Sequence, residues 1–335
     1  TVQSAGMTFL HHFACNSCAA RNEMFNMHTH EPIIRMLNTS TECSDPCHIV
    51  LGINTIGAMA TANLFQQSAS QLDRCANSIS DTMARHFEDW RVQSAGCRTL
   101  GTLANCSNGY IRTQSILQAL RAFSTNARIA ENAMFALGNC MCNAAAAADF
   151  VREAGLQEIC NCVRSHKTAQ KVVREGCRAL ENIASNFAND KSQFGAEYFS
   201  AAQCVDFSLE ILQHALNSHV EALVQGATAA ILSLSYQPLL AQELAEGVAI
   251  KLLFRSISEN KDVPKIVRDS LGVLHNMQLS GNIADQSPNR IALVIELLGS
   301  YVDDHDVTLK LLQCLCDMGA DSDLRVVGKF GGLEN

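Results

Sequence analysis

The stretch Val92-Gln-Ser-Ala-Gly-Cys-Arg-Thr-Leu-Gly-Thr-Leu-Ala104 recurs as Val172-Val-Arg-Glu-Gly-Cys-Arg-Ala-Leu-Glu-Asn-Ile-Ala184, and a shorter copy stands at Val2-Gln-Ser-Ala-Gly6. A helical segment that recurs along a chain indicates one module stacked several times, because a single module cannot bury its apolar face alone. This pattern favours a binding scaffold over a catalyst.

The small residue at the centre of the stretch marks each repeat. We place these markers at Gly6, Gly52, Gly96, Ala133, Gly176, Gly226, Ser270 and Leu311. They lie about 44 residues apart on average, which is the size class of HEAT and armadillo repeats. The predicted repeats therefore cover residues 1–42, 43–86, 87–123, 124–168, 169–218, 219–260, 261–304 and 305–335.

The marker predicts a close contact between helices. A glycine inside a helix costs roughly 1 kcal/mol relative to alanine, so its recurrence indicates that a neighbouring helix backbone passes nearby. A residue four positions after the marker lies on the same helix face. These positions hold Leu100, Leu137, Leu180, Ala230, Leu274 and Leu315, which we expect to form a core stripe.

A second apolar helix separates successive markers. Examples are Ile33-Ile-Arg-Met-Leu37, Phe207-Ser-Leu-Glu-Ile-Leu212 and Ile291-Ala-Leu-Val-Ile-Glu-Leu-Leu298. Turns that contain glycine precede several of these helices, as at Val151-Arg-Glu-Ala-Gly155. The whole pattern predicts an all-α chain.

The endings of two marker helices, Leu137-Gly-Asn139 and Asn182-Ile-Ala184, resemble the armadillo repeat family. The stretch Val326-Val-Gly-Lys-Phe-Gly-Gly-Leu333 resembles the family's junction between first and second helices. The resemblance implies a right-handed α-solenoid of about eight three-helix units whose terminal units are incomplete. The resemblance covers the whole chain and is strongest at 92–185. In the second and eighth units the sequence does not distinguish an armadillo repeat from a HEAT repeat.

Composition and charge narrow the class of protein. The 335 residues are 47% hydrophobic and carry a net charge of −8 that is spread evenly. A nucleic-acid surface usually has a basic stripe, and a membrane span needs about 18 apolar residues in a row; neither occurs. No linker divides the sequence, so we predict one solenoid over 1–335, with further domains of the same protein beyond both ends.

The fifteen cysteines are best explained as reduced thiols. Cys97, Cys140, Cys177 and Cys314 lie within marker helices, where a free cysteine behaves as a small apolar residue. This usage predicts a reducing, cytoplasmic location.

We predict no cofactor and no metal site. If zinc is bound, its candidate ligands are Cys15, Cys18, His28 and His30, which match the spacing of zinc ligands only in part. No phosphate-binding loop, nucleophile elbow or zinc-protease motif is present, so we predict that the chain is not an enzyme.

The armadillo resemblance places the binding surface on an inner groove, at positions two and six residues after each marker. Four residues apart on a helix share a face. The predicted groove residues are Arg98, Phe135, Asn139, Arg178, Asn182 and Asn276. Relatives that carry nuclear cargo have tryptophan and asparagine at these positions, and their asparagines bind the backbone of an extended peptide.

The tryptophans of those relatives are missing here, and Arg98 and Arg178 stand at two of their positions. Arginines suit an acidic partner and repel a basic one. Each arginine is equally well explained by a solvated face or by an ion pair to a neighbouring repeat.

We predict a protein–protein interaction scaffold or adaptor whose groove holds an extended or helical segment of a protein partner, acidic in character. One alternative is a structural arm of a large kinase, cytoskeletal or ciliary protein. A nuclear-import receptor is disfavoured because the tryptophan ladder is missing.

Overall fold

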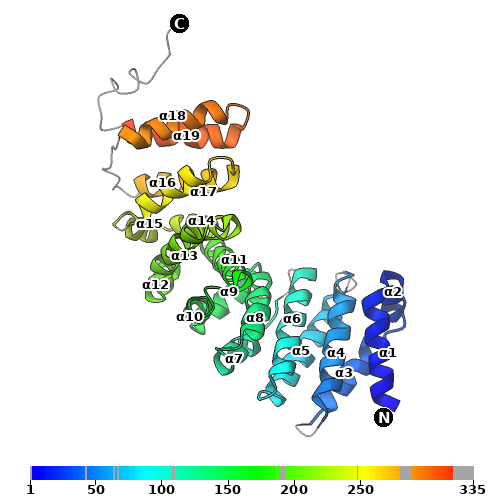
Figure 1. Cartoon of the computed structure of the whole chain (residues 1–335). Helices are drawn as coiled ribbons and strands as arrows, with labels where there is room; N and C mark the ends of the chain where they lie inside the picture. Colours follow the sequence, from blue (N-terminus) through cyan, green and yellow to red (C-terminus); the bar gives the residue numbers. More distant parts are fainter. Residues whose placement is uncertain are drawn as a thin grey trace. The chain divides into compact units, whose positions relative to one another are not determined.

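The computed structural model describes residues 2–41, 44–62, 65, 68–107, 110–188, 194–246, 248–279 and 288–319. Within these ranges all regular structure is helical, in nineteen helices, and the prediction of an all-α fold is confirmed (Figure 1). The chain divides into two compact bodies, residues 1–186 and 187–335. The predicted junction at 326–333 lies outside the described residues.

All eight markers lie in helices, which we call marker helices. They are α1 (Val2–Asn16), α4 (Pro46–Ala60), α6 (Trp90–Ser107), α8 (Ala127–Cys140), α11 (Gln170–Phe187), α14 (Glu221–Ser235), α17 (Pro264–Leu279) and α19 (His305–Gly319). In the first body α1, α4, α6 and α8 lie side by side in chain order (Figure 1). In the second body α14, α17 and α19 do the same.

One or two further helices connect each marker helix to the next. Those that pack against the marker helix that follows them are α3 (His30–Thr39), α5 (Ala69–Arg85), α7 (Gln114–Ala122), α13 (Cys204–Ser218), α16 (Ala249–Glu259) and α18 (Pro288–Ser300). The helix α10 (Gly155–Ser165) occupies the same place before α11. An additional first helix occurs in four intervals, as α2 (Cys18–Asn26), α9 (Ala144–Arg152), α12 (Phe194–Ala201) and α15 (Pro238–Ala245). Each of the other three intervals has a single helix among the residues described.

Side-chain caps fix where several helices begin. The Asn126 side chain accepts hydrogen bonds from the backbone N–H groups of Arg128 and Ile129 at the start of α8. Asn143 caps α9 by accepting from Ala146 N–H, and Asp45 caps α4 by accepting from Cys47 N–H. Such caps satisfy N–H groups that a helix end leaves without a partner, so they define the entry to each helix from the local sequence.

Three of the markers face the connecting helix that precedes their marker helix. A β-carbon at Gly52 would lie 2.7 Å from Cε of Met36 on α3, and β-carbons at Gly96 and Gly176 would overlap Met83 of α5 and Val163 of α10. The neighbouring helix is present as predicted. However, it reaches the marker with a side chain, whereas the prediction was of a backbone.

The predicted core stripe is present. The exposed fractions of Leu100, Leu137 and Leu180 are 0–1%, and Ala230 and Leu274 are also buried, whereas Leu315 is half-buried. Cysteines contribute to the same interior, because Cys97, Cys140 and Cys177 are buried free thiols. Burial raises the pKa of each of these three thiols to about 12, so they are protonated and behave as small apolar side chains.

Replacing Gly176 with leucine should destabilise the fold by about 1–3 kcal/mol, because the new side chain would collide with the β-branched Val163 on α10. Denaturant unfolding followed by circular dichroism measures the change. The matched control is Gly6→Leu at the marker of α1, where a β-carbon meets nothing within 4 Å. This control should leave the stability unchanged or raise it slightly. Equal effects at both markers would contradict the packing role.

Candidate functional site

The strongest candidate for a binding site is a hollow of about 840 Å³ in the first body, which we call the Arg98 hollow. Marker helices α1, α4, α6 and α8 all contribute to it. Its lining includes the residues two and six positions after the marker on two helices, Asn54 and Ala58 on α4 and Arg98 and Thr102 on α6. On these two helices the positions two and six residues after the marker therefore share one surface.

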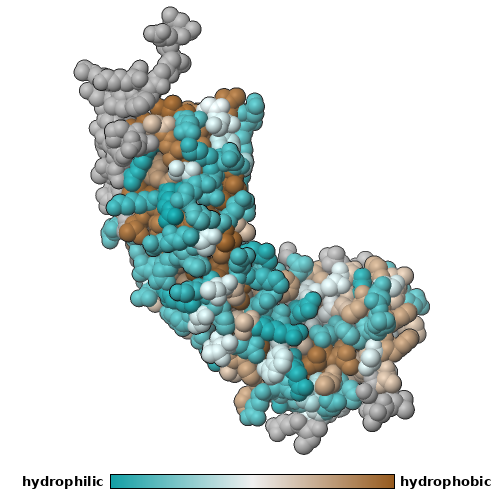
Figure 2. Space-filling view, in the orientation of Figure 1, coloured by the Kyte–Doolittle hydropathy of each residue, from teal (hydrophilic) through white to brown (hydrophobic). Residues whose placement is uncertain are grey.

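The Arg98 hollow is basic on an acidic chain. Its lining includes Arg21, Arg91, Arg98 and Arg128 but only one carboxylate, Glu131. That carboxylate is already paired, since Lys171 Nζ lies 2.7 Å from Glu131 Oε1. Figure 2 shows the mixed polar and apolar surface of this body. An anionic ligand would therefore find unsatisfied positive charge in the hollow.

Two of these arginines are available to a ligand. Arg98 and Arg128 are exposed, and within the described part of the chain neither forms an ion pair. The Arg128 guanidinium stands 6.0 Å from the ring centre of Trp90, a cation–π distance. By contrast, the Arg91 guanidinium is bound to Asp89 at 2.7 Å. Arg21 donates from Nη1 to the Ala14 carbonyl oxygen at 2.9 Å.

Trp90 and Arg128 are groove residues that the sequence analysis missed. They lie in the first turn of α6 and of α8, six and five residues before their markers. Trp90 is 42% exposed, which leaves part of an aromatic surface open beside the basic groups. The feature of the sequence that could have indicated these two residues is their position near the start of successive marker helices. Neither residue stands two or six residues after a marker, where the resemblance places the groove.

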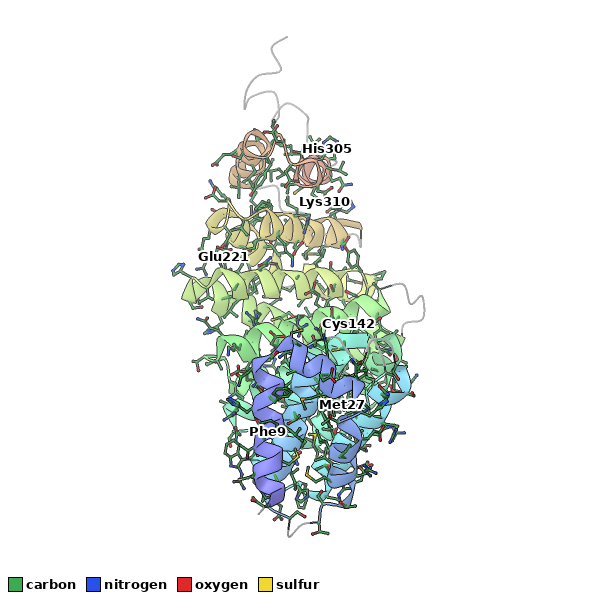
Figure 3. The ribbon with its side chains drawn as sticks, turned by 90° about the vertical axis from the view of Figure 1, so that its right-hand side faces the viewer. Phe9, Met27, Cys142, Glu221, His305 and Lys310 are labelled. Atoms are coloured by element: carbon green, nitrogen blue, oxygen red, sulfur yellow. The ribbon has the colours of Figure 1, made fainter. Side chains whose placement is uncertain are left out.

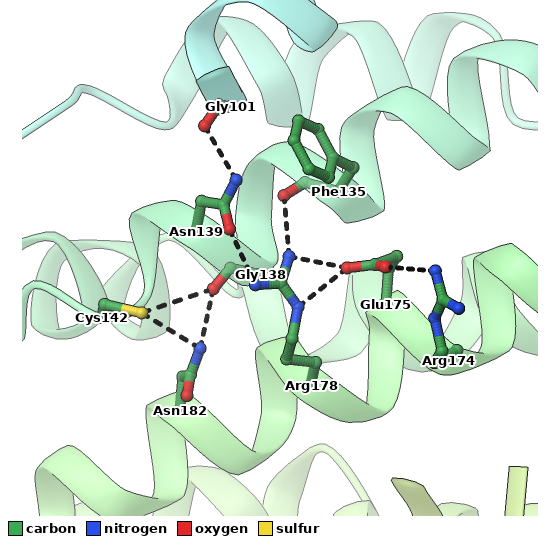
Figure 4. Close-up of polar contacts among 9 residues, drawn as sticks. All are labelled: Gly101, Phe135, Gly138, Asn139, Cys142, Arg174, Glu175, Arg178 and Asn182. Atoms are coloured by element: carbon green, nitrogen blue, oxygen red, sulfur yellow. Dashed lines mark hydrogen bonds and ion pairs between the residues drawn. The ribbon is translucent and has the colours of Figure 1, made fainter. Parts of the chain in front are cut away.

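Three other predicted groove residues are bound to each other or to the preceding repeat (Figure 4). Asn139 donates from Nδ2 to the Gly101 carbonyl oxygen on α6 at 2.8 Å, and its Oδ1 accepts from Arg178 Nη1 at 2.7 Å. Asn182 donates from Nδ2 to the Gly138 carbonyl oxygen on α8 at 2.7 Å. Asn139 is only 7% exposed, so its amide has little surface left for a partner.

Arg178 holds α11 on α8. Its guanidinium lies 2.6 Å from Glu175 Oε2 on its own helix, and its Nη2 donates to the Phe135 carbonyl oxygen at 3.4 Å. Glu175 is 9% exposed and also pairs with Arg174 at 3.0 Å. The ion pair of Arg178 is therefore within its own helix, and its contacts with the preceding repeat are hydrogen bonds, whereas the sequence had left open an ion pair to a neighbouring repeat.

The last two predicted groove residues also pack between marker helices. Phe135 is half-buried, and its Cδ1 would lie 2.9 Å from a β-carbon at Gly101. Asn276, in the second body, donates from Nδ2 to Ser235 Oγ on α14 at 2.9 Å. Of the six predicted groove residues, only Arg98 lines the hollow.

A second row of glycines, which the sequence analysis did not use, explains how the marker helices approach each other. Gly57, Gly101 and Gly138 each lie five residues after a marker. A β-carbon at Gly101 would lie 2.7 Å from the Ala136 Cα on α8, and one at Gly57 would lie 2.8 Å from Thr99 Oγ1 on α6. Only glycine permits such an approach, and it exposes the carbonyl groups to the asparagines of the next repeat.

The four zinc candidates lie at the junction of α1, α2 and α3. Cys15 and Cys18 are exposed, on α1 and at the start of α2. His28 and His30 are 5.9 Å apart between ring centres. The structure brings no three of the His, Cys, Asp or Glu side chains that it describes together to hold a metal ion.

His30 is fully buried against aromatic rings. Its imidazole stacks on Phe25 at 5.3 Å and meets Phe65 edge-on at 5.9 Å. Burial lowers the pKa of His30 below its usual value, more than the nearby Glu31 carboxylate raises it. The ring is therefore a neutral core group in the folded protein.

Comparison with known proteins identifies the fold. No protein family model and no curated protein matches the sequence. A structure from work on a phosphorylation switch that controls the interaction between cadherin and beta-catenin matches with a TM-score of 0.74 and 14% identity, over 96% of this chain and 66% of that one. The fold is thus an α-solenoid of the armadillo type seen in beta-catenin.

Two engineered proteins have similar folds. One matches with a TM-score of 0.59 and 14% identity over 98% of this chain and 87% of its own. The other matches with a TM-score of 0.52 and 16% identity over 73% of this chain and 96% of its own. These low identities establish the fold alone.

Among the residues described, no helix is long and apolar enough to cross a membrane.

Replacing Arg178 with alanine should destabilise the first body by about 1–3 kcal/mol, because Asn139 Oδ1 loses its donor and the buried Glu175 carboxylate keeps only its contact with the exposed Arg174. Thermal unfolding followed by circular dichroism measures the loss. Arg174→Ala is the matched control, since Arg174 binds the same carboxylate from an exposed position. Its effect should be below about 1 kcal/mol. A larger loss for the Arg174 variant would contradict the inter-repeat role of Arg178.

The stability of the protein should fall as the pH drops below about 6.5, in part because of His30. The unfolded histidine takes up a proton near that pH, whereas the buried ring resists protonation until a lower pH. The contribution of His30 to stability is complete above the pKa of this histidine in the unfolded chain. It is lost as the pH falls through the lower pKa of the same histidine in the folded protein. The variant His30→Phe should show a shallower loss of melting temperature between pH 7 and pH 5. Parallel curves for both proteins would exclude this contribution.

Proposed function

We propose that this chain is a non-catalytic, protein-binding scaffold, and that the Arg98 hollow holds an extended acidic segment of a protein partner. One observation carries the proposal. The groove positions of two successive marker helices share a hollow in which Arg98 and Arg128 are exposed and, within the residues described, make no ion pair. The armadillo-type fold supports it, because stacked helical repeats commonly present an extended binding surface.

Each group in the hollow has a role that suits such a segment. Arg98 and Arg128 can bind carboxylates by paired hydrogen bonds. The Asn54 side chain makes no hydrogen bond to any described residue and is half-exposed, so its amide can bind a peptide backbone. The open surface of Trp90 can pack against an apolar side chain of the segment.

The proposal assigns partner binding to only one of the six predicted groove residues. In the proposal, Arg98 binds the partner, whereas Asn139, Arg178, Asn182 and Asn276 join successive marker helices. The exposed positive charges would also attract an acidic segment at a distance and raise its rate of association at low salt.

The free thiols of the described cysteines suit a reducing compartment, and we propose a cytoplasmic location.

The test measures binding of a fluorescein-labelled peptide of alternating glutamate and serine by fluorescence anisotropy. The wild-type chain should bind it, with an affinity that falls as the ionic strength rises. The double variant Arg98→Glu and Arg128→Glu should lose at least about tenfold in affinity while its unfolding curve stays the same. Both side chains are exposed, so the fold should tolerate the changes.

A matched control reverses a charge away from the hollow. Arg152 on α9 is 57% exposed and pairs with Asp149, so Arg152→Glu should leave peptide affinity unchanged. A peptide of alternating lysine and serine should not bind the wild-type chain. Tighter binding of the lysine peptide, or equal affinity of the double variant for the glutamate peptide, would refute the proposal.

A further inference from the structure

Contacts between α6 and α8 recur at one fixed offset along the two helices. Asn132 on α8 donates from Nδ2 to the Ser94 carbonyl oxygen on α6 at 3.2 Å. Asn139 makes the equivalent bond to the Gly101 carbonyl oxygen, and each donor lies 38 residues after its acceptor. The two helices therefore run parallel in a fixed register. Figure 3 looks at the row of marker helices from the side of α1, the foremost helix, which carries Phe9.

The same offset places the Arg128 guanidinium at Trp90. Arg128 also lies 38 residues after Trp90, and its Cζ stands 6.0 Å from the centre of the tryptophan ring. The packing of α8 and the aromatic ring together fix the position of this positive charge along α6. The charge lies at the level of Trp90, at the beginning of α6.

The second exposed positive charge of the hollow lies farther along the same helix. Arg98 follows Trp90 by eight residues on α6. An α-helix rises about 1.5 Å per residue, so these two levels are about 12 Å apart. The Arg98 hollow thus offers two guanidinium groups, of Arg98 and Arg128, that are separated by about 12 Å along the axis of α6.

This separation selects a spacing of carboxylates on an extended ligand. An extended chain rises about 3.3 Å per residue, and its side chains point to the same face at every second residue. Carboxylates two residues apart on one face are therefore separated by about 6.6 Å, and carboxylates four residues apart by about 13 Å. Only the spacing of four residues matches the two arginines.

The floor of the hollow favours an extended occupant over a helix. Ser94 and Asn132 both line the hollow and bond to each other, Nδ2 to Oγ at 2.8 Å, which closes the seam between α6 and α8. A helix with its side chains is about 10–12 Å wide and cannot enter such a seam. Asn54 lines the hollow from α4, and its amide can bind the backbone groups that an extended chain leaves open, whereas a helix satisfies its own.

We propose that the partner of the Arg98 hollow carries two carboxylates four residues apart on an extended segment that lies along α6. This inference rests on the proposed function, because it specifies the acidic segment assigned to the same hollow. One carboxylate binds Arg98 and the other binds Arg128, each through paired hydrogen bonds. The three residues between the carboxylates pass over Ser94 and Ala95, which line the hollow.

The experiment measures the affinity of fluorescein-labelled peptides by fluorescence anisotropy. Three peptides of about twelve residues of serine and glycine each contain two glutamates, which are two, four or eight residues apart. Their net charges are equal, so their long-range attraction to the hollow is the same. The peptide with a spacing of four should bind at least about fivefold tighter than the other two.

A fourth peptide separates the extended from the helical conformation. It has the spacing of four and a proline midway between the glutamates, which excludes a helix there. We expect it to bind as tightly as the serine and glycine peptide of the same spacing. Glutamates eight residues apart reach a separation of about 12 Å only in a helix, so tightest binding at that spacing would indicate a helical occupant.

Two single variants assign the glutamates to the arginines. Arg98→Gln and Arg128→Gln should each lower the affinity for the spacing-four peptide to that of a peptide with one glutamate, and each should abolish the preference for spacing. The control Arg152→Gln, on α9 at a side chain that is 57% exposed, should keep both the affinity and the preference. Circular dichroism checks that all three variants retain the fold.

The outcomes distinguish this inference from the proposed function. Equal affinities at all three spacings, tightest binding at two or eight residues, or loss of binding by the proline peptide would overturn the inference alone. Binding of the alternating glutamate and serine peptide without binding of the spacing-four peptide would do the same. Failure of every glutamate peptide to bind, the alternating one included, would refute the proposed function as well.

Discussion

The close approach of successive marker helices is the constraint on which the rest of the structure depends. In the first body it requires glycine five residues after the marker, because the Ala136 Cα on α8 comes within 2.7 Å of where a β-carbon of Gly101 would be. At that separation an asparagine side chain of one helix reaches the backbone carbonyl of the helix before it, as Asn139 and Asn182 do. Helix spacing and polar contacts are thus coupled: a wider spacing would break these hydrogen bonds along with the van der Waals contact.

The repeat itself was predictable from the sequence because it depends on local spacing. The interval between markers and the apolar residue four positions later both express helix periodicity, and Leu100, Leu137 and Leu180 are buried as predicted. The roles of Asn139 and Arg178 were not predictable in the same way. Only the distance to the preceding helix decides whether such side chains reach it or remain open to a partner.

The same reasoning explains why the candidate site is smaller than the sequence suggested. Arg98 and Arg178 occupy equivalent places in the repeated stretch, yet Arg178 has Glu175 three residues before it and Asn139 on the previous helix. At the position of Glu175 the repeat of Arg98 has Ala95. On the preceding helix, Ala58 stands at the position of Asn139. The loss of both polar partners therefore separates an arginine that joins repeats from an arginine that is open to solvent. Sequence similarity between repeats does not imply that equivalent residues have equivalent functions.

The buried thiols can report how often neighbouring repeats separate. Cys97 on α6 and Cys140 on α8 are both buried, and Cys140 adds to the rise that burial causes in the pKa of Cys97; Cys177 occupies the corresponding interior of α11. With pKa values near 12 and almost no exposed surface, they can react with an alkylating reagent only when the helices separate. Because each thiol sits at a different place along the stack, the order in which they become labelled would rank the repeats by how often they open.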